Sequence, residues 1–170
     1  MWRLIWLGPL ALLVVALFTV EPGAEKVAGC RPPPHEEKLL DRYEDDRAIA
    51  VRPSGARGRD PIRTEACVQQ SREDTTATSV MRRWFGKRAY SEAELRGLYG
   101  GTGWEPVPTA HPGGTTLVYL RYCRLVERVV SYLDVLLLDD AAARDDTPYE
   151  VNVNITAYAG ERSCPPPART

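Results

Sequence analysis

The strongest hydrophobic pattern of this chain lies at its start. Residues 4–20 carry no charge, and 14 of these 17 residues are apolar. As a helix, the run from Leu4 to Val20 is about 26 Å long, slightly short of a hydrocarbon core of ~30 Å. Arg3 precedes it, and positive charge holds that end of a membrane segment inside the cell. The sequence therefore predicts a single-pass anchor in the cell membrane over residues 1–20, with the C-terminal domain outside the cytoplasm.

Two other interpretations of this segment stay open. A secretory signal needs a small residue shortly before its cleavage site, and Pro22 stands in that place for a cut after Ala24. The sequence Val-Ala-Gly-Cys ending at Cys30 resembles the acylated-cysteine signal of bacterial lipoproteins, although two charged residues precede it where that family has uncharged ones. The alternatives are therefore secretion after signal cleavage and a lipid anchor at Cys30.

A helical period follows a spacer. Residues 21–34 are rich in proline and glycine, which predicts a semi-rigid spacer. Beyond it, Leu39, Leu40 and Tyr43 fall on one helical stripe. This pattern predicts a short amphipathic helix beginning near His35.

A second helix is marked by its capping residues. Ser91 and Glu94 have the spacing of a capping box, in which the two side chains bond the unpaired backbone groups at a helix start. The helix is expected over about 92–99. The glycines at 100–101 are expected to end it, because glycine accepts the left-handed conformation there. Trp104 is expected to be a core anchor beneath it.

The remaining patterns predict strands. Strands are expected over 48–53, 66–69, 78–85, 115–124, 129–138 and 149–157, with a loop over 54–64 and a polar turn over 70–77. A helix from Leu117 to Leu133 also fits the apolar spacing of residues 115–138. In the strand expected over 149–157, Val151, Val153, Ile155 and Ala157 face one side, and Glu150, Asn152, Asn154 and Thr156 face the other. The fold class predicted is α+β, an antiparallel sheet of about four to five strands with two helices packed on one side. This exported domain is expected over 35–164, with a C-terminal tail over 165–170.

Composition changes this picture in two ways. The first 30 residues hold 20 apolar ones, so the folded domain has a leaner core than the 44% hydrophobic content of the whole chain suggests. The net charge is −1, from 22 Lys and Arg against 23 Asp and Glu. Recognition of nucleic acid by a whole domain needs a clear basic excess, so no nucleic-acid partner is expected.

The four cysteines predict disulfides. Cys30, Cys67, Cys123 and Cys164 are too far apart in sequence for a zinc or redox CxxC motif, and an even number in an exported chain favours disulfide bonds. A bond between Cys67 and Cys123 is expected because both lie in predicted strands. Cys30 and Cys164 share a proline-rich context and would join the two ends of the domain, and the other connectivities stay open.

Catalytic and metal-binding motifs are scarce. The chain has two histidines, His35 and His111, and lacks the GxSxG, HExxH and Walker A patterns. Asp139, Asp140, Asp145 and Asp146 form an acidic loop over 139–146, for which a solvated loop is favoured over a calcium site. No catalytic residue, cofactor or metal ligand is therefore assigned.

Two basic stretches carry a further hypothesis. Residues 52–59 and 82–88 hold arginines, and aromatic residues interrupt the second stretch. Such surfaces bind anionic glycans, lipid headgroups or nucleic acid. An edge strand kept from aggregating by its charges is the favoured interpretation.

The order of the motifs carries a resemblance. I-x-V-x-P-x-G from Ile49, T-S-V-x-R-x-W from Thr78 and Gly103-Trp104 follow a membrane segment, and the chain has 19 Arg against 3 Lys. In these features it resembles small uncharacterised membrane-anchored or secreted proteins of high-GC Gram-positive bacteria. The resemblance implies an exported protein, and no catalytic residue carries over from it.

These observations lead to two functional expectations. The first is a non-catalytic, membrane-anchored envelope domain that contacts another protein or a cell-wall polymer. The alternative is an exported small-ligand or cation-binding receptor, or a hydrolase, that uses the 139–146 loop.

Overall fold

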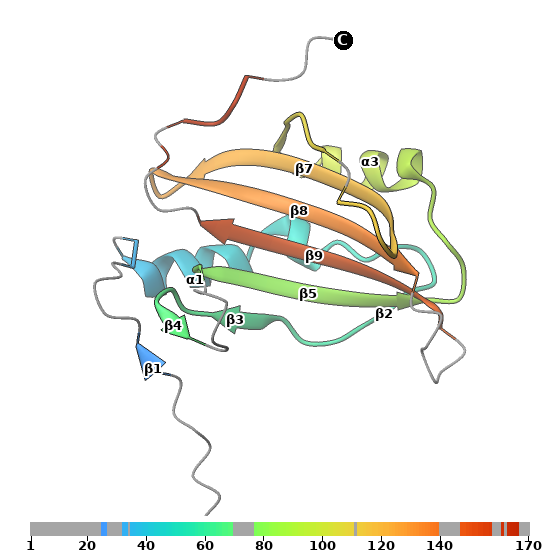
Figure 1. The fold of residues 1–170 in the computed structure, drawn as a ribbon, viewed down its shortest axis with the longest axis horizontal. Coiled ribbons are helices and arrows are strands. Elements are labelled where there is room, and N and C mark those ends of the chain that lie inside the picture. Colours follow the sequence, from blue (N-terminus) through green and yellow to red (C-terminus); the bar gives the residue numbers. More distant parts are fainter. Residues whose placement is uncertain are drawn as a thin grey trace, which may run out of the picture.

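The computed structural model describes residues 25–26, 32–33, 35–69, 77–110, 112–139, 147–157, 161 and 163–166. Within these residues, an antiparallel sheet of seven strands packs against three helices (Figure 1). The strand order is β2-β5-β9-β8-β7-β6, and β3 also pairs with β5. A separate pair joins β1 to β4. The predicted α+β class with an antiparallel sheet is confirmed.

Four long strands form the body of the sheet. They are β5 (Ser79–Gly86), β7 (Thr116–Val126), β8 (Val129–Asp139) and β9 (Tyr149–Ala157). The short strands are β1 (Glu25–Lys26), β2 (Arg57–Gly58), β3 (Ile62–Thr64), β4 (Val68–Gln69) and β6 (Glu105–Pro106). The sheet thus exceeds the four to five strands expected, because segments of two or three residues are too short to show an alternating pattern.

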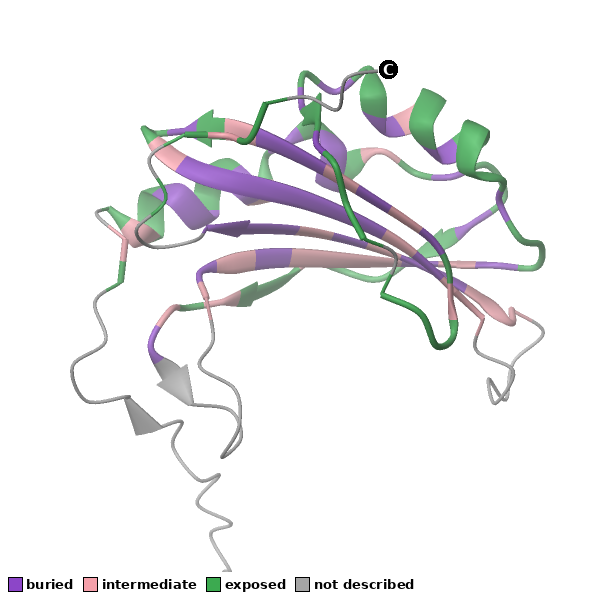
Figure 2. Cartoon of the chain, turned by 45° about the horizontal axis from the view of Figure 1, so that its top comes forward, coloured by how far each residue is buried: buried purple, intermediate pink, exposed green. Residues whose placement is uncertain are grey.

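One face of the sheet carries the main core. Alternate residues of the long strands, such as Val80, Leu120, Val135 and Val153, are buried together with apolar residues of the helices. Figure 2 shows burial concentrated along the long strands and the inner sides of the helices. The alternating pattern of the strands therefore predicted correctly which residues face the core, including the inward alternation expected for residues 149–157.

The first and third helices agree with the sequence patterns. Helix α1 (Glu36–Glu44) buries Leu39, Leu40 and Tyr43. The Tyr43 hydroxyl lies 2.5 Å from the Ser131 Oγ on β8, and burial raises the pKa of Tyr43 to about 12.

Helix α3 (Glu92–Gly100) begins with the predicted capping box of Ser91 and Glu94. Its end differs from expectation, since Gly101 has φ −80° and does not adopt the left-handed conformation. Trp104 follows as a core residue, as predicted.

The strand expected over 48–53 is wrong, because helix α2 (Arg47–Ala50) begins there. The Asp46 side chain caps this helix by accepting a hydrogen bond from the Ala48 amide at 2.8 Å. It also accepts from Trp104 Nε1 at 3.1 Å and pairs with Arg124 on β7. Local capping and a partly buried ion pair therefore override the strand propensity of this segment.

The loop expected over 54–64 is also corrected. It contains β2 and β3, both paired with β5. Cys67 lies in a turn with φ 64°, and the strand expected over 66–69 is confined to β4. The segment expected as a polar turn lies largely outside the described residues, at 70–76.

The segment 115–138 is a hairpin, and the helix considered from Leu117 to Leu133 is wrong. Strands β7 and β8 pair up to Val126 and Val129, on either side of a two-residue turn. Glu127 and Arg128 in the turn both have positive φ, as a type I′ turn requires. Glu127 also bonds Lys38 of α1, which ties the hairpin to the helix layer.

The expected disulfide between Cys67 and Cys123 is wrong. Cys123 on β7 is bonded to Cys164, with their Cα atoms 5.7 Å apart. This also excludes the expected bond between Cys30 and Cys164. Cys67 follows β3, and β5, β9 and β8 lie between β3 and β7. Four strand spacings are about 19 Å, beyond the ~7 Å limit that a disulfide allows between Cα atoms.

The expected membrane anchor over residues 1–20 lies outside the described residues. No helix in the described part of the chain has the length and apolar character needed to cross a membrane. Strand β1 lies within the segment expected as a spacer, where it pairs with β4.

Candidate functional site

The sheet has a second face, turned away from the helices, that is unusually polar. The register places Arg83, Asn152, Leu136 and Tyr119 in one row across the strands, and Met81, Asn154, Asp134 and Arg121 in the next. We call this surface the open face. It comprises Met81, Arg83, Phe85, Tyr119, Arg121, Cys123, Tyr132, Asp134, Leu136, Leu138, Glu150, Asn152, Asn154 and Thr156.

A buried carboxylate lies at the centre of the open face. Asp134 is 8% exposed. Its Oδ1 accepts a hydrogen bond from the Tyr119 hydroxyl at 2.8 Å, and Arg121 Nε lies 3.0 Å from the same oxygen. Burial raises the pKa of Asp134 above its usual value, although Tyr119 and Arg121 oppose the shift. The carboxylate holds the two neighbouring polar groups in fixed positions.

Two asparagines continue this polar surface on β9. The amide oxygens of Asn152 and Asn154 are buried, and neither has a hydrogen-bond partner among the described residues. The Asn154 Nδ2 donates to the Thr156 Oγ1 at 2.9 Å. Residues two apart on a strand project side by side on the same face. A buried acceptor without a partner is uncommon in folded proteins, and a bound water, ion or ligand often accounts for it.

Ion pairs and aromatic rings flank the asparagines. Arg83 Nε lies 3.5 Å from the Glu150 Oε1, on the side toward β5. On the other side, the Arg121 guanidinium lies 4.5 Å from the centroid of the Tyr132 ring. The open face therefore offers hydrogen-bond donors, acceptors and planar groups together.

The C-terminal segment crosses one end of this face. Tyr132 donates a hydrogen bond to Glu161, and Cys164 is bonded to Cys123. Val107 and Val130 complete a small apolar cluster there with Cys123, Tyr132 and Cys164. The disulfide thus holds the end of the domain against the sheet.

The two basic stretches of the sequence meet at one edge of the sheet. Strand β2 pairs with β5 so that Arg57 is opposite Phe85 and Gly58 is opposite Trp84. The Arg59 guanidinium lies 5.0 Å from the Phe85 ring centroid, and the Arg82 guanidinium 4.4 Å from that of Trp84. We call Arg57, Arg59 and Arg82 the arginine edge.

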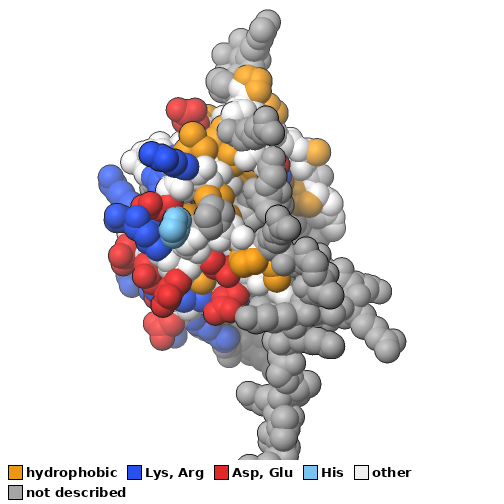
Figure 3. Space-filling view, turned by 90° about the vertical axis from the view of Figure 1, so that its left-hand side faces the viewer, with side chains coloured by type: hydrophobic (Ala, Val, Ile, Leu, Met, Phe, Trp, Pro, Cys, Tyr) orange, Lys and Arg blue, Asp and Glu red, His pale blue; other side chains and the backbone are white. Residues whose placement is uncertain are grey.

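The surface around the start of α1 differs from the arginine edge in its charges. The end of the molecule where α1 begins shows acidic and basic side chains intermixed (Figure 3). Ion pairs such as Arg42 with Glu127 and Arg63 with Asp41 account for part of this mixture. The arginine edge therefore differs from this end in having a single sign of charge.

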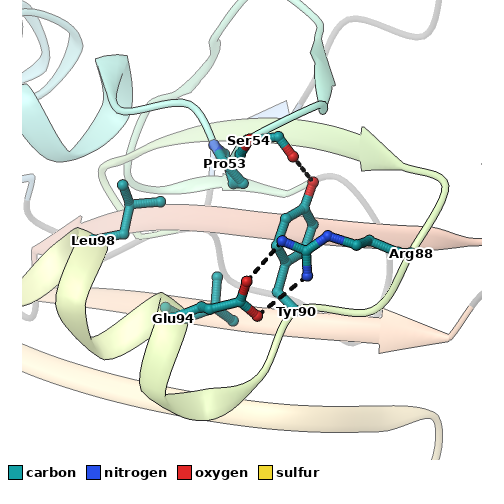
Figure 4. Close-up of a pocket in the computed structure, with 7 residues that line it drawn as sticks. Pro53, Ser54, Arg88, Tyr90, Glu94 and Leu98 are labelled. Atoms are coloured by element: carbon teal, nitrogen blue, oxygen red, sulfur yellow. Dashed lines mark hydrogen bonds and ion pairs between the residues drawn. The ribbon is translucent and has the colours of Figure 1, made fainter.

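A small cavity lies between α3 and the loop after α2 (Figure 4). Its volume is about 190 Å³, below the ~300 Å³ at which small-molecule sites usually begin. The residues that line it are Pro53, Ser54, Arg88, Tyr90, Glu94, Leu95 and Leu98.

The polar groups of this cavity bond one another. Arg88 Nη2 lies 2.7 Å from the Glu94 Oε1, and the Tyr90 hydroxyl donates to the Ser54 carbonyl at 2.9 Å. Hydrogen bonds from Arg88 and then from Ser91 lower the pKa of Glu94 to about 2. These bonds connect α3 to the loop after α2, so the polar groups of the cavity bond one another.

The other sequence candidates contribute little to the open face. Asp139 ends β8, and the rest of the 139–146 acidic loop lies outside the described residues, as does His111. His35 is exposed at the start of α1, with φ 58°. Among the described residues, no cluster of three or more His, Cys, Asp or Glu is placed to hold a metal ion.

Sequence reasoning missed most of the open face. The polar side of 149–157 was visible in the alternation, which identified Asn152 and Asn154 as facing away from the core. The pairing of Arg121 with Asp134 depends on the hairpin register, which the competing helical pattern concealed.

Comparison with protein families, with curated proteins and with solved structures finds no match.

Proposed function

We propose that this chain is a membrane-anchored extracytoplasmic domain that binds, without catalysis, a polysaccharide strand of the cell wall on its open face. The observation that carries the proposal is the pair of partly exposed asparagines, Asn152 and Asn154, whose amide oxygens have no hydrogen-bond partner in the described part of the chain. Sugar hydroxyls donate hydrogen bonds to such oxygens and accept them from amide and guanidinium groups. Tyr119 and the Arg121–Asp134 pair lie in the adjoining rows of the same face.

The chemistry of the surface favours a polysaccharide over a protein partner. The centre of a protein interface is usually apolar, with charged residues depleted. Here the row that contains Asn154, Asp134 and Arg121 is polar. The exposed large apolar residues among those described are Ile62 on β3 and Leu117 and Leu125 on β7, and Leu125 lies at the end of this same face. A polymer of hydroxyl groups complements that surface better.

The proposal is tested by co-sedimentation of the full-length protein with purified cell-wall polysaccharide. We expect the Asn152→Ala/Asn154→Ala variant to bind at least about tenfold more weakly, since one lost hydrogen bond is worth about 1 kcal/mol. The control variant is Glu92→Ala/Arg96→Ala, which removes an exposed pair on α3. Equal binding by the asparagine variant, or crosslinking of a protein to the open face in its place, would contradict the proposal.

A further inference from the structure

The arginine edge carries charges that no carboxylate among the described residues neutralises. Among the described residues, Arg57 and Arg59 form no ion pair, and both are exposed. Three nearby arginines differ in having carboxylate partners: Arg63 has Asp41 and Glu44, Arg83 has Glu150, and Arg88 has Glu94. Asp60 is the one acidic residue between positions 50 and 64. Among the described residues of this edge, positive charges therefore outnumber negative ones.

The chain enters the domain at the same edge. Strands β2 and β3 both lie along the outer side of β5, with Arg57 opposite Phe85 and Ile62 opposite Met81. These two β5 positions are four residues apart, or about 13 Å along a strand. Strand β4 follows β3, and β1 pairs with β4 (Figure 1).

The tether between strand β1 and the expected anchor is short, while Arg57 and Arg59 lie toward the other end of this edge, opposite Phe85 and Arg83. Four residues separate Val20, where the apolar run ends, from Glu25, where β1 begins. Four extended residues reach at most about 14 Å. A tether of that length keeps the β1 end of this edge close to the surface of the membrane.

We propose that the arginine edge rests on anionic phospholipid headgroups of the membrane in which the chain is anchored. This inference depends on the anchor of the proposed function and not on its polysaccharide ligand. Guanidinium groups bind phosphate through paired hydrogen bonds, and Arg57 and Arg59 are available for such bonds. Docking through this edge orients the sheet upright on the membrane. The open face is then accessible from the side.

The test uses the full-length protein in nanodiscs. One set contains phosphatidylcholine alone, and the other contains about 30% phosphatidylglycerol. Hydrogen–deuterium exchange is followed in peptides that cover residues 57–64. We expect slower exchange in the anionic discs only, and loss of that protection at high salt.

Matched variants separate local docking from total charge. Arg57→Gln/Arg59→Gln removes two charges from the edge, and Arg42→Gln/Arg96→Gln removes two exposed charges from the helices. Each basic residue near an anionic surface contributes about fivefold, so the edge variant is expected to dock about 25-fold more weakly. The helix variant is expected to dock as the unmodified protein does, and melting temperatures check that both variants fold.

The outcomes distinguish this inference from the proposed function. Equal exchange in both disc types, or protection that appears only when cell-wall polymer is added, overturns the inference. Flotation with phosphatidylcholine vesicles reports on the anchor separately. Flotation that occurs only with anionic vesicles, and is lost in the edge variant, removes the anchor while supporting lipid binding by the arginines.

Discussion

At the scale of single residues, Gly58 in β2 is a point where the sheet has no room for a side chain. A Cβ atom there would lie 2.6 Å from the Trp84 Cε3 and closer still to the Cζ3. The indole ring is 4% exposed and has the Arg82 guanidinium 4.4 Å from its centroid, so it has little freedom to move aside. Close contact between backbone and ring is therefore what joins the arginine edge to the core.

This contact predicts a large difference between two Gly→Ala substitutions. Gly58→Ala is expected to lower the free energy of unfolding by about 1–3 kcal/mol, because it overpacks the Trp84 site. Gly97→Ala is the control, since its Cβ meets nothing within 4 Å on α3 and alanine favours helix. Thermal denaturation measures both, and a Gly58→Ala protein as stable as the unmodified chain would show that the ring is not fixed as described.

The buried carboxylate of Asp134 predicts a specific pH dependence of stability. Its pKa is raised above the usual 3.8 in the folded state, so the folded protein holds that proton more tightly than the unfolded chain does. The stability contributed by protonation is present at low pH and is lost as the pH rises from about 3.8 through the raised value.

Asp134→Asn isolates this effect, because asparagine does not titrate. The melting temperature of the variant minus that of the unmodified protein is expected to become more positive between about pH 4 and the raised pKa. The loss of the ion pair with Arg121 adds an offset, so the informative quantity is the slope with pH. A difference that falls with rising pH would mean that Arg121 and Tyr119 outweigh burial.

At the scale of elements, sequence patterns predicted what depends on periodicity. Helices α1 and α3 and strands β5, β7, β8 and β9 each span at least eight residues, long enough for an apolar period to be visible. The features that the sequence patterns did not predict depend on contacts between elements. Asp46 converts a strand-like segment into α2 by bonding to residues far along the chain.

The candidate site was predicted less completely for the same reason. The sequence of β9 indicates a polar side, yet its neighbours across the sheet follow from the β7–β8 register. That register is set by a turn of Glu127 and Arg128, and these residues lack the glycine or asparagine that usually marks such turns. The sequence therefore does not predict which side chains pair across the strands.

Disulfide connectivity is a prediction at this same scale. Cys123 is bonded to Cys164, and Cys67 is also in a disulfide bond, with Cys30 the remaining cysteine of the sequence. The pairing of β1 with β4 brings residues 25–26 beside 68–69, close in sequence to both Cys30 and Cys67. We therefore expect a second bond between Cys30 and Cys67.

Non-reducing peptide mapping decides between the connectivities. Two crosslinked peptides are expected, one joining residues 123 and 164 and the other joining residues 30 and 67. A peptide joining Cys67 to Cys123 would contradict the strand order of the sheet. Cys164→Ser is expected to cost about 4 kcal/mol in the chain-entropy model, given the sequence separation of 41 residues.

At the scale of the whole molecule, the sheet gives the domain two surfaces for which we propose separate roles. The open face presents paired and unpartnered polar groups suited to a polymer, and the arginine edge presents unneutralised charge on the side where the chain enters. Both proposals place the domain next to a membrane. The anchor over residues 4–20 is therefore the prediction on which the arrangement of the whole molecule depends.

Leu12→Arg tests that anchor at the middle of the apolar run. An arginine at the centre of a membrane helix costs about 2.5–3.5 kcal/mol, and a run of 17 residues has no spare length with which to shift the charge toward an interface. The unmodified chain and a Leu12→Val control are expected to stay in the membrane pellet after alkaline extraction, while Leu12→Arg moves largely to the supernatant.

Intact mass distinguishes the other interpretations, because a chain that begins after Ala24 indicates a cleaved signal and a lipid adduct at Cys30 indicates acylation. A cleaved signal removes the tether, so docking of the arginine edge would then have to rest on its own affinity for anionic lipid, whereas acylation holds the chain at the membrane through Cys30.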